Sequence, residues 1–321
     1  MAKVTLKDIA NRAGVSVALV SSYLNKKPNA RMTNETKQKI DTAIAQLDYR
    51  GSAIARSLRT GKSYIIGYVA KSMRTEIAQN ELMAVMAAAE EENYQVFATF
   101  NTSYEKTLSS IQMLIARGCD GIILSGSFDQ EFSSYICQKF KPVFILNVHP
   151  NVTIPGMMIR YDYRSTIGDI ITYLREKNHK NIFYQTYFEH AVDQRYLEFV
   201  KLCGEKNVWQ ISNPTVEDLQ KFYRDNPDCT AMLHLNDFIA MQTIQLCNKL
   251  SINVPHDLAI VGWDNVKAAS CYTPSLSSVQ KPLDLAAFYA IKSLLNQING
   301  NTVEIPETLP CKFIARESIG M

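Results

Sequence analysis

The sequence has few of the features that support catalysis or covalent cross-linking. Its seven cysteines are scattered, odd in number and never spaced as Cys-x-x-Cys, which argues against a disulfide framework and against a zinc site. The five histidines stand alone, and no Gly-x-Gly-x-x-Gly, Gly-x-Ser-x-Gly or His-Glu-x-x-His motif is present. We therefore expect no catalytic residue, no metal and no cofactor, and hence no enzyme.

Long apolar runs are also missing. No run approaches the ~18 apolar residues of a membrane-spanning helix, and the N-terminus shows no apolar signal region. A hydrophobic content of 46% is typical of a globular protein. We expect a cytoplasmic protein that makes no contact with a membrane. Its 321 residues leave room for a small head and a body of two lobes.

Charge is distributed unevenly along the chain. Residues 1–62 contain twelve Lys and Arg against four Asp and Glu, a net charge of +8, whereas the whole chain carries +3. Residues 63–321 therefore carry −5. A small basic domain gains affinity for the DNA polyanion by releasing condensed counterions, so the head is a candidate DNA-binding domain.

Helical spacing within the head predicts three short helices. Thr5, Ser16 and Thr33 are suitable N-caps for helices that begin after each of them, and Gly14 supplies a sharp turn between the first two. The second helix is expected to run to about Leu24. Its outward-facing residues are expected near its N-terminal end: Val17, Ala18, Ser21 and Ser22. Two short helices joined by such a turn form a helix-turn-helix, whose second helix enters the major groove.

The same segment resembles a known family. Residues 5–25 read Thr-Leu-Lys-Asp-Ile-Ala-Asn-Arg-Ala-Gly-Val-Ser-Val-Ala-Leu-Val-Ser-Ser-Tyr-Leu-Asn. Many positions at fixed spacing match the headpiece of the lactose-repressor/galactose-repressor family of bacterial transcription regulators. The resemblance implies that residues 1–50 form a DNA-binding headpiece. The candidate DNA-binding residues in it are Thr5, Ser16, Val17, Ala18, Leu19, Ser21, Ser22 and Asn25.

The second helix departs from the family at its groove-facing positions. Ser22 stands where an arginine is usual, and an arginine can clamp O6 and N7 of guanine, which is worth about 1–3 kcal/mol of discrimination. We predict that Val17 and Ala18 contact thymine methyls, that Ser21 and Ser22 bond to base or phosphate, and that Asn25 anchors the DNA backbone. The operator should then differ from the common family sequence at the guanine that the arginine would read.

Residues 51–62 are expected to form a hinge. The stretch 52–58 spans about two helical turns, and isolated helices shorter than ~12 residues are marginal in water, so a flexible basic linker is the alternative. In the family this segment forms a helix only on operator DNA, paired with its dimer mate in the minor groove. The resemblance therefore implies DNA contacts by Arg56, Ser57 and Leu58, with Leu58 wedged between base pairs.

From residue 64 onward, β-branched runs alternate with amphipathic segments. Strands are expected at 65–70, 96–100, 121–124, 143–147, 181–185, 231–235 and 258–261. Helices are expected, among others, at 82–92, 104–117, 165–177, 194–205, 237–250 and 283–298. This alternation predicts parallel sheets flanked by helices, an α/β body of two lobes over residues 63–321. Ligands of such sheets bind beyond the carboxyl ends of the strands, and the cleft between the lobes is the natural site.

The body also looks like the effector domain of the same family, which is similar to periplasmic sugar-binding proteins. The resemblance rests on landmarks such as Cys119-Asp120-Gly121-Ile122-Ile123-Leu124 and Ile260-Val261-Gly262-Trp263-Asp264, and it covers essentially the full chain. It implies that Arg195 donates to ligand oxygens, that Asn236 both donates and accepts, and that Asp264 accepts from hydroxyls. Structural roles remain open for each: a paired arginine, a helix-capping asparagine, an aspartate in a turn. Trp263 either lines the cleft or packs beneath it.

Two loops of the first lobe depart from the family. Where Asp-x-Ser-Asn-Pro-Phe-Phe is usual, this chain reads Lys71-Ser72-Met73-Arg74-Thr75-Glu76-Ile77, with charges in place of a stacking surface. Either the effector is charged, such as a sugar phosphate or sugar acid engaging Arg74 and Lys71, or the cleft binds nothing tightly. Asn147, which begins Asn147-Val148-His149 where Asp-Arg is usual, is a further candidate for effector binding.

The resemblance implies a sequence-specific regulator, a repressor of carbohydrate-metabolism genes. Such a regulator binds a palindromic operator as a homodimer and responds allosterically to a sugar-like effector between its lobes. The dimer interface is expected on exposed helices of the lobes, including the one from about Leu82. Two alternatives remain: a periplasmic binding protein, which would need a signal sequence where the basic head stands, and an enzyme.

Overall fold

The computed structural model describes residues 4–24, 32–49, 57, 60–126, 128–146, 152–187 and 193–320. The chain divides into two compact units, Met1–Ser63 and Tyr64–Met321, each of which is described by itself. Four of the predicted contact residues lie outside the described residues: Asn25, Arg56, Leu58 and Asn147. Within the described ranges, no helix is both long enough and apolar enough to cross a membrane.

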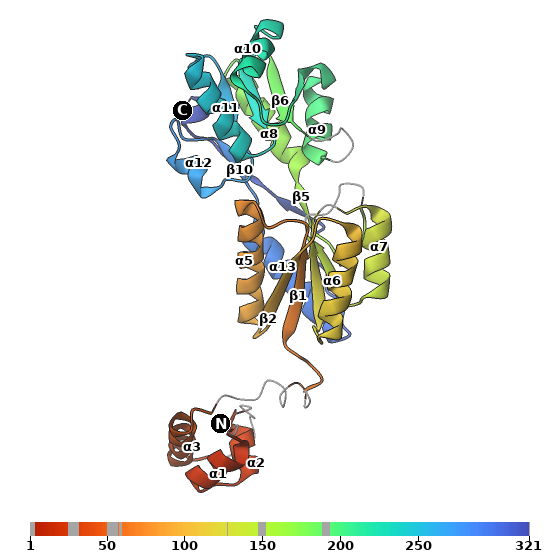
Figure 1. The fold of residues 1–321 in the computed structure, drawn as a ribbon, viewed down its shortest axis with the longest axis vertical. Coiled ribbons are helices and arrows are strands. Elements are labelled where there is room, and N and C mark those ends of the chain that lie inside the picture. Colours follow the sequence, from red (N-terminus) through yellow and green to blue (C-terminus); the bar gives the residue numbers. More distant parts are fainter. Residues whose placement is uncertain are drawn as a thin grey trace. The chain divides into compact units, whose positions relative to one another are not determined.

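The described part of the first unit contains the three predicted helices, α1 (Leu6–Ala13), α2 (Val17–Leu24) and α3 (Asn34–Gln46) (Figure 1). Side-chain caps define where they begin, since the Ser16 and Thr33 hydroxyls each accept a backbone N–H of the following helix at 3.2 Å. Gly14 makes the turn after α1 in the left-handed region, at φ +67°. The apolar faces of the helices meet in one small core: Ile9, Ala10, Ala13, Val20, Ile40 and Ala43.

The first lobe of the second unit is a parallel sheet covered by helices on both faces. Its strands, in the order β2-β1-β3-β4, are β1 (Ile65–Ala70), β2 (Gln95–Phe100), β3 (Gly121–Ser125) and β4 (Val143–Leu146). Its helices are α5 (Glu76–Glu91), α6 (Tyr104–Ala116), α7 (Gln130–Lys139) and α13 (Leu283–Ile298). Successive strand residues point to opposite faces, so α5 and α13 bury one face of the sheet while α6 and α7 bury the other.

The second lobe repeats this architecture. Its parallel sheet, in the order β7-β6-β8-β9, consists of β6 (Ile182–Thr186), β7 (Val208–Gln210), β8 (Ala231–His234) and β9 (Ala259–Val261). Its helices are α8 (Tyr163–Glu176), α9 (Gln194–Cys203), α10 (Val216–Asp225), α11 (Asp237–Lys249) and α12 (Lys267–Cys271). Helices α8 and α9 pack on one face of the sheet, and α10 and α11 pack on the other. The predicted α/β class with parallel sheets is confirmed.

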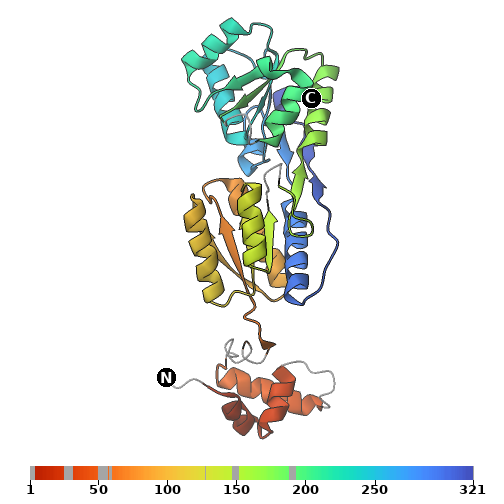
Figure 2. The ribbon, with the colours of Figure 1, turned by 90° about the vertical axis from the view of Figure 1, so that its right-hand side faces the viewer.

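The chain passes between the lobes three times, as Figure 2 shows. The first passage is β5 (Arg160–Asp162), the second runs from β10 (Ser278–Gln280) into α13, and the third returns through β11 (Thr308–Pro310) to β12 (Lys312–Ile314). Strands β5 and β11 pair in parallel, and β10 and β12 pair antiparallel. A connection of three adjacent segments allows the lobes to rotate about it while it keeps them together.

Two boundaries differ from the sequence expectation for local reasons. Helix α5 begins at Glu76, six residues before the predicted start, because the Thr75 hydroxyl accepts the Ala78 N–H at 3.4 Å and caps the helix there. Helix α8 begins at Tyr163 because the Asp162 carboxylate accepts the Ser165 N–H at 3.0 Å. The short strands β5, β7, β10, β11 and β12 were not among those predicted.

A glycine after β9 provides a test of the packing between this strand and α11. A Cβ on Gly262 would overlap Oδ1 of Asp237 and lie 2.9 Å from Cδ2 of Leu276, and both neighbours are buried. We expect Gly262→Ala to lower the free energy of unfolding in urea by about 1–3 kcal/mol.

Gly168, within α8, is the matched control, since nothing lies within 4 Å of a Cβ added there. Gly168→Ala should raise the free energy of unfolding by about 0.5–1 kcal/mol, because alanine is the better helix former. Equal stabilities of the two variants would contradict this description of the packing.

Candidate functional site

The outer face of α2 is the candidate DNA-binding surface. Val17 and Ala18 are exposed, whereas Val20, on the opposite side, is fully buried. Ser21 and Ser22 are half-buried. This face therefore offers methyl groups and hydroxyls, which are groups that can contact thymine methyls, base edges and phosphates.

Contacts within the first unit hold α2 in place. The Tyr23 hydroxyl donates to the Asp41 carboxylate of α3 at 2.7 Å, and Leu19 is half-buried. Thr5 and Ser16 are exposed and take part in capping: the Asp8 carboxylate accepts from the backbone N–H and the hydroxyl of Thr5, and the Ser16 hydroxyl accepts the Leu19 N–H. In the predicted hinge, the Ser57 carbonyl accepts the Gly61 N–H at 2.8 Å. The DNA contacts of all these residues stay predictions.

A pocket of about 320 Å³ lies where strands of the first lobe end. One part of its wall comes from the segment after β1 and the start of α5: Lys71, Ser72, Thr75, Ile77, Ala78 and Glu81. Ser125 and Gly126 follow from the end of β3. The passages between the lobes supply Tyr161, Lys281 and Leu283. The carboxyl ends of the strands thus form a ligand-sized pocket, as the fold predicts.

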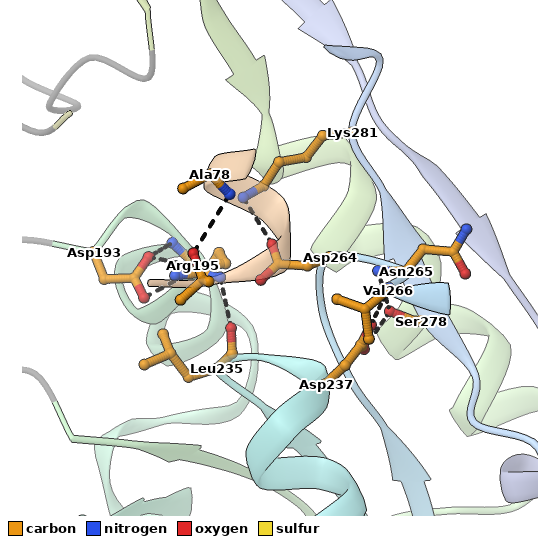
Figure 3. A network of polar contacts seen from close by, with 11 residues as sticks. Ala78, Asp193, Arg195, Leu235, Asp237, Asp264, Asn265, Val266, Ser278 and Lys281 are labelled. Atoms are coloured by element: carbon orange, nitrogen blue, oxygen red, sulfur yellow. Dashed lines mark hydrogen bonds and ion pairs between the residues drawn. The ribbon is translucent and has the colours of Figure 1, made fainter. Parts of the chain in front are cut away.

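Lys281 connects this pocket to the second lobe. Its side chain is only 9% exposed, and its Nζ lies 2.8 Å from Oδ1 of Asp264, which follows β9 (Figure 3). Burial alone would lower the pKa of Lys281, but the Asp264 carboxylate outweighs this effect and holds the pKa above its usual value. The predicted effector-binding carboxylate of Asp264 is therefore engaged by a lysine of the same chain. Nothing in the sequence pattern distinguished Lys281 from other lysines.

Arg195 is also paired within the chain. Its Nε lies 3.0 Å from Oδ1 of Asp193, and its Nη1 donates to the Leu235 carbonyl at 2.7 Å (Figure 3). The guanidinium lies 5.4 Å from the ring centroid of Trp263 and 5.6 Å from that of Tyr163. The structural role named for Arg195, that of a paired arginine, is present, and its ligand contact stays a prediction.

Asn236 and Trp263 have structural roles as well. The Asn236 side-chain oxygen accepts the Ile239 N–H at 3.0 Å and caps α11. Trp263 is fully buried, and its ring packs edge-on against Tyr163 at a centroid distance of 5.4 Å. In this conformation the indole offers no surface to a ligand, so Trp263 packs beneath the cleft.

Only part of the charged loop of the first lobe, residues 71–77, lines the pocket. Arg74 is exposed and is absent from the pocket wall, whereas Lys71 lines it. The Lys71 ammonium lies 4.4 Å from the ring centroid of Phe128 and 5.3 Å from that of Tyr104, and burial lowers its pKa. An aromatic cluster of Tyr104, Phe128 and Phe132 therefore adjoins this loop. The sequence reading of the loop itself did not reveal it.

A buried acid in α5 was also missed. Oε1 of Glu81 accepts from the Tyr68 hydroxyl at 2.8 Å and from the Ser125 hydroxyl. Burial raises the pKa of Glu81, while the two hydroxyls oppose this shift. Glu81 shares its helical face with Ala84 and Val85, three and four residues later, which are buried. That spacing is the signal that could have identified it.

One hydrogen bond joins the two lobes directly across the cleft. The Glu76 carboxylate, in the first turn of α5, accepts the backbone N–H of Lys267 at 2.8 Å. Lys267 is the first residue of α12 in the second lobe, so an acid of one lobe caps a helix of the other.

Comparisons with known proteins agree with this architecture. The pattern of bacterial regulatory proteins of the lacI family matches residues 5–52, and that of a periplasmic binding protein-like domain matches residues 171–319. The chain is 27% identical to the probable HTH-type transcriptional regulator EndR of Paenibacillus polymyxa, covering 87% of this chain and 86% of the relative. It is 26% identical to the HTH-type transcriptional repressor PurR of Pectobacterium atrosepticum, covering 95% of each.

Among solved structures, the lac repressor dimer bound to operator and the anti-inducer ONPF is similar in fold. Its TM-score is 0.82 at 21% identity, and the match covers 99% of each chain.

A helix-turn-helix unit followed by a two-lobed binding body defines a transcription regulator with a ligand-binding domain. The chain belongs to the lactose-repressor/galactose-repressor family. Since the members of this family are transcription regulators, the prediction that the chain is not an enzyme is confirmed by the comparisons.

Asp237, next to this site, predicts a pH dependence of stability. Its carboxylate accepts from the Ser278 hydroxyl at 2.5 Å and from the Val266 N–H at 2.8 Å (Figure 3). Burial raises its pKa from 3.8 to about 7. Because the folded state holds this proton more tightly than the unfolded state, the contribution to stability is full below about pH 4 and is lost as the pH rises through 7.

We therefore expect the wild type to lose stability between pH 5 and pH 8 relative to Asp237→Asn, as measured by urea denaturation at each pH. Parallel stability profiles of the two proteins over this range would contradict the assignment.

Proposed function

We propose that this chain is a repressor that binds a palindromic operator as a homodimer and is controlled by a small-molecule effector held between its lobes. The effector is a sugar or charged sugar derivative, the regulated genes serve carbohydrate metabolism, and the protein acts in the cytoplasm, where its DNA lies. One observation carries the proposal: the same chain has a face of α2 with exposed methyl groups and half-buried hydroxyls, and a pocket whose wall comes from strand ends and from two of the three passages.

The domain organisation follows from the same features. Residues 1–50 are the headpiece, 51–62 the hinge, and 63–321 the effector-binding and dimerisation body. The basic charge of the head supports DNA binding in general, since counterion release gives affinity without sequence preference. The groove-facing side chains of α2 supply the specificity.

Control by the effector requires the lobes to move. The three passages permit rotation, and the contact between Glu76 and Lys267 makes one lobe arrangement favourable. An effector that prefers a different arrangement shifts the spacing of the two hinges in the dimer and so changes affinity for the operator, with a coupling of about 1–3 kcal/mol.

An exposed apolar surface on the first lobe supports the dimer. Met83 and Met86 on α5 are 66% and 49% exposed, and Leu285 and Phe288 on the neighbouring α13 are 42% and 48% exposed. We define these four residues as the apolar helix face. Exposed apolar side chains on two helices that pack together are typical of an interface between proteins, and a second copy of the chain is the proposed partner.

This assignment predicts the effect of charge on the oligomeric state. Met83→Glu together with Phe288→Glu should convert the dimer to a monomer in sedimentation equilibrium, because burying two carboxylates on each side of the interface is costly. Leu202→Glu, at a residue 43% exposed on α9 of the second lobe, is the matched control and should stay dimeric. A double variant that remains dimeric would place the interface elsewhere.

The role of position 22 can be tested by restoring an arginine. Ser22→Arg should gain preference for guanine at one operator position by about 1–3 kcal/mol in binding assays after in vitro site selection. Ser22→Lys, which adds the charge without the planar fork, should tighten binding to all sequences more uniformly. The assignment fails if the arginine variant selects the same sites as the wild type.

A further inference from the structure

The wall of the pocket carries the ammonium groups of Lys71 and Lys281 and a Tyr161 hydroxyl without a hydrogen-bond partner among the described residues, and these groups indicate the chemistry of the ligand. Its volume of about 320 Å³ is at the lower end of the ~300–1,000 Å³ of small-molecule sites, which suits one compact metabolite. The inference rests on the proposed function, in which this pocket receives the effector.

Lys281 is the first donor. An ammonium has three N–H groups, and the ion pair with Asp264 at 2.8 Å lies on one side of it. The same ammonium lies 5.9 Å from the ring centroid of Tyr161. Asp264 therefore holds Lys281 in a fixed position on the pocket wall while further N–H groups remain to bind an acceptor.

Tyr161 is the second donor. It lines the pocket, it is only 3% exposed, and its buried hydroxyl has no hydrogen-bond partner within the described part of the chain. Buried hydroxyls are nearly always paired, because an unmade hydrogen bond in the interior is costly. An unpartnered hydroxyl at the wall of a ligand pocket is explained if a ligand supplies the acceptor.

The start of α5 adds a third set of donors. Thr75 caps this 16-residue helix, and Ile77 and Ala78 of its first turn line the pocket together with Lys281. Figure 3 shows Ala78 and Lys281. The N-terminus of a helix presents backbone N–H groups and the positive end of the helix dipole, both of which favour an anion.

The acidic groups nearby are already engaged. Oε1 of Glu81 accepts from two hydroxyls of the first lobe, those of Tyr68 and Ser125, and Asp264 is paired with Lys281. Glu81 is thus held by hydrogen bonds and Asp264 by an ion pair, whereas the Tyr161 hydroxyl has neither among the described residues. Beside the ammonium of Lys281, which can only donate, a ligand acceptor is the group that would pair with both side chains.

We propose that the effector is an acidic small molecule whose carboxylate or phosphate group is bound by Lys281, the Tyr161 hydroxyl and the first turn of α5. Lys281 and Tyr161 are then the residues that distinguish the acid from a neutral molecule of the same skeleton. In this proposal they take the task that the sequence suggested for Arg74, which does not line the pocket.

Pairs of compounds that differ only in the acidic group test the proposal on the full-length protein. Isothermal titration calorimetry would compare glucuronate with glucose, and glucose 6-phosphate with glucose, and inorganic phosphate would be titrated alone. We expect at least one acid to bind on the order of tenfold or more tightly than its neutral partner, as a hydrogen bond to a charged group implies. The two pairs distinguish a carboxylate from a phosphate as the bound group.

Tyr161→Phe gives the sharper test, because it should move stability and binding in opposite directions. Removing an unpartnered buried hydroxyl should raise the Tm, while affinity for the acid should fall on the order of tenfold. Tyr223→Phe is the matched control, since the Tyr223 hydroxyl is also buried without a partner among the described residues, but its side chain packs against the core of the second lobe and does not line the pocket. That variant should gain stability and bind the acid like the wild type.

A second variant addresses Lys281 without leaving a buried charge alone. In the double variant Lys281→Gln, Asp264→Asn both charges are removed together, so the protein should stay folded, as judged by its Tm, and lose its preference for the acid. The proposal is overturned if neutral partners bind as tightly as the acids, if none of the acids binds, or if Tyr161→Phe leaves the affinity for the acid unchanged. Operator binding by the wild type would be measured separately. If the wild type binds the operator, the repressor function proposed above is still supported in each of these cases.

Discussion

Two buried cations and their carboxylates determine the form of the cleft between the lobes. A charge buried without a partner costs several kcal/mol, so Lys281 and Arg195 are stable in the interior only beside Asp264 and Asp193. The first pair fixes the start of the passage from β10 to α13, and the second holds a guanidinium over the ring of Trp263. The pocket wall, the passage and the packing of the second lobe all meet at these contacts.

Much of the fold was predictable because its signals are local. The caps at Ser16 and Thr33, the turn at Gly14 and the spacing of Ile9, Ala10 and Ala13 specify the headpiece within fifty residues. In the lobes, alternating strands and amphipathic helices give the class and the position of the cleft. These features arise from hydrogen bonds and burial between residues that are close in sequence.

The remainder depends on contacts between distant residues. Strands β5 and β11 are three residues long and pair with each other across about 150 residues of sequence, so no pattern within either one could reveal them. The same holds for the site. Asp264 was found from its motif, but its partner Lys281 lies in a segment without a motif, and the sequence left open whether Arg195 contacts a ligand or is paired, as it is here with Asp193. A sequence motif can identify a candidate side chain, but it does not reveal which partner that side chain contacts in the folded protein.

The position of helix α13 in the sequence affects the order in which the lobes can fold during synthesis. It begins at Leu283, yet its residues Ala286, Ala290 and Leu294 fill the core of the first lobe against α5, which begins at Glu76. During synthesis, most of the chain must therefore leave the ribosome before the first lobe can close its core, even though its four strands are complete by Leu146. The first lobe to be translated is thus unable to finish folding until the second lobe has been made, and a chain that stops before residue 283 exposes the face of the sheet that α13 covers.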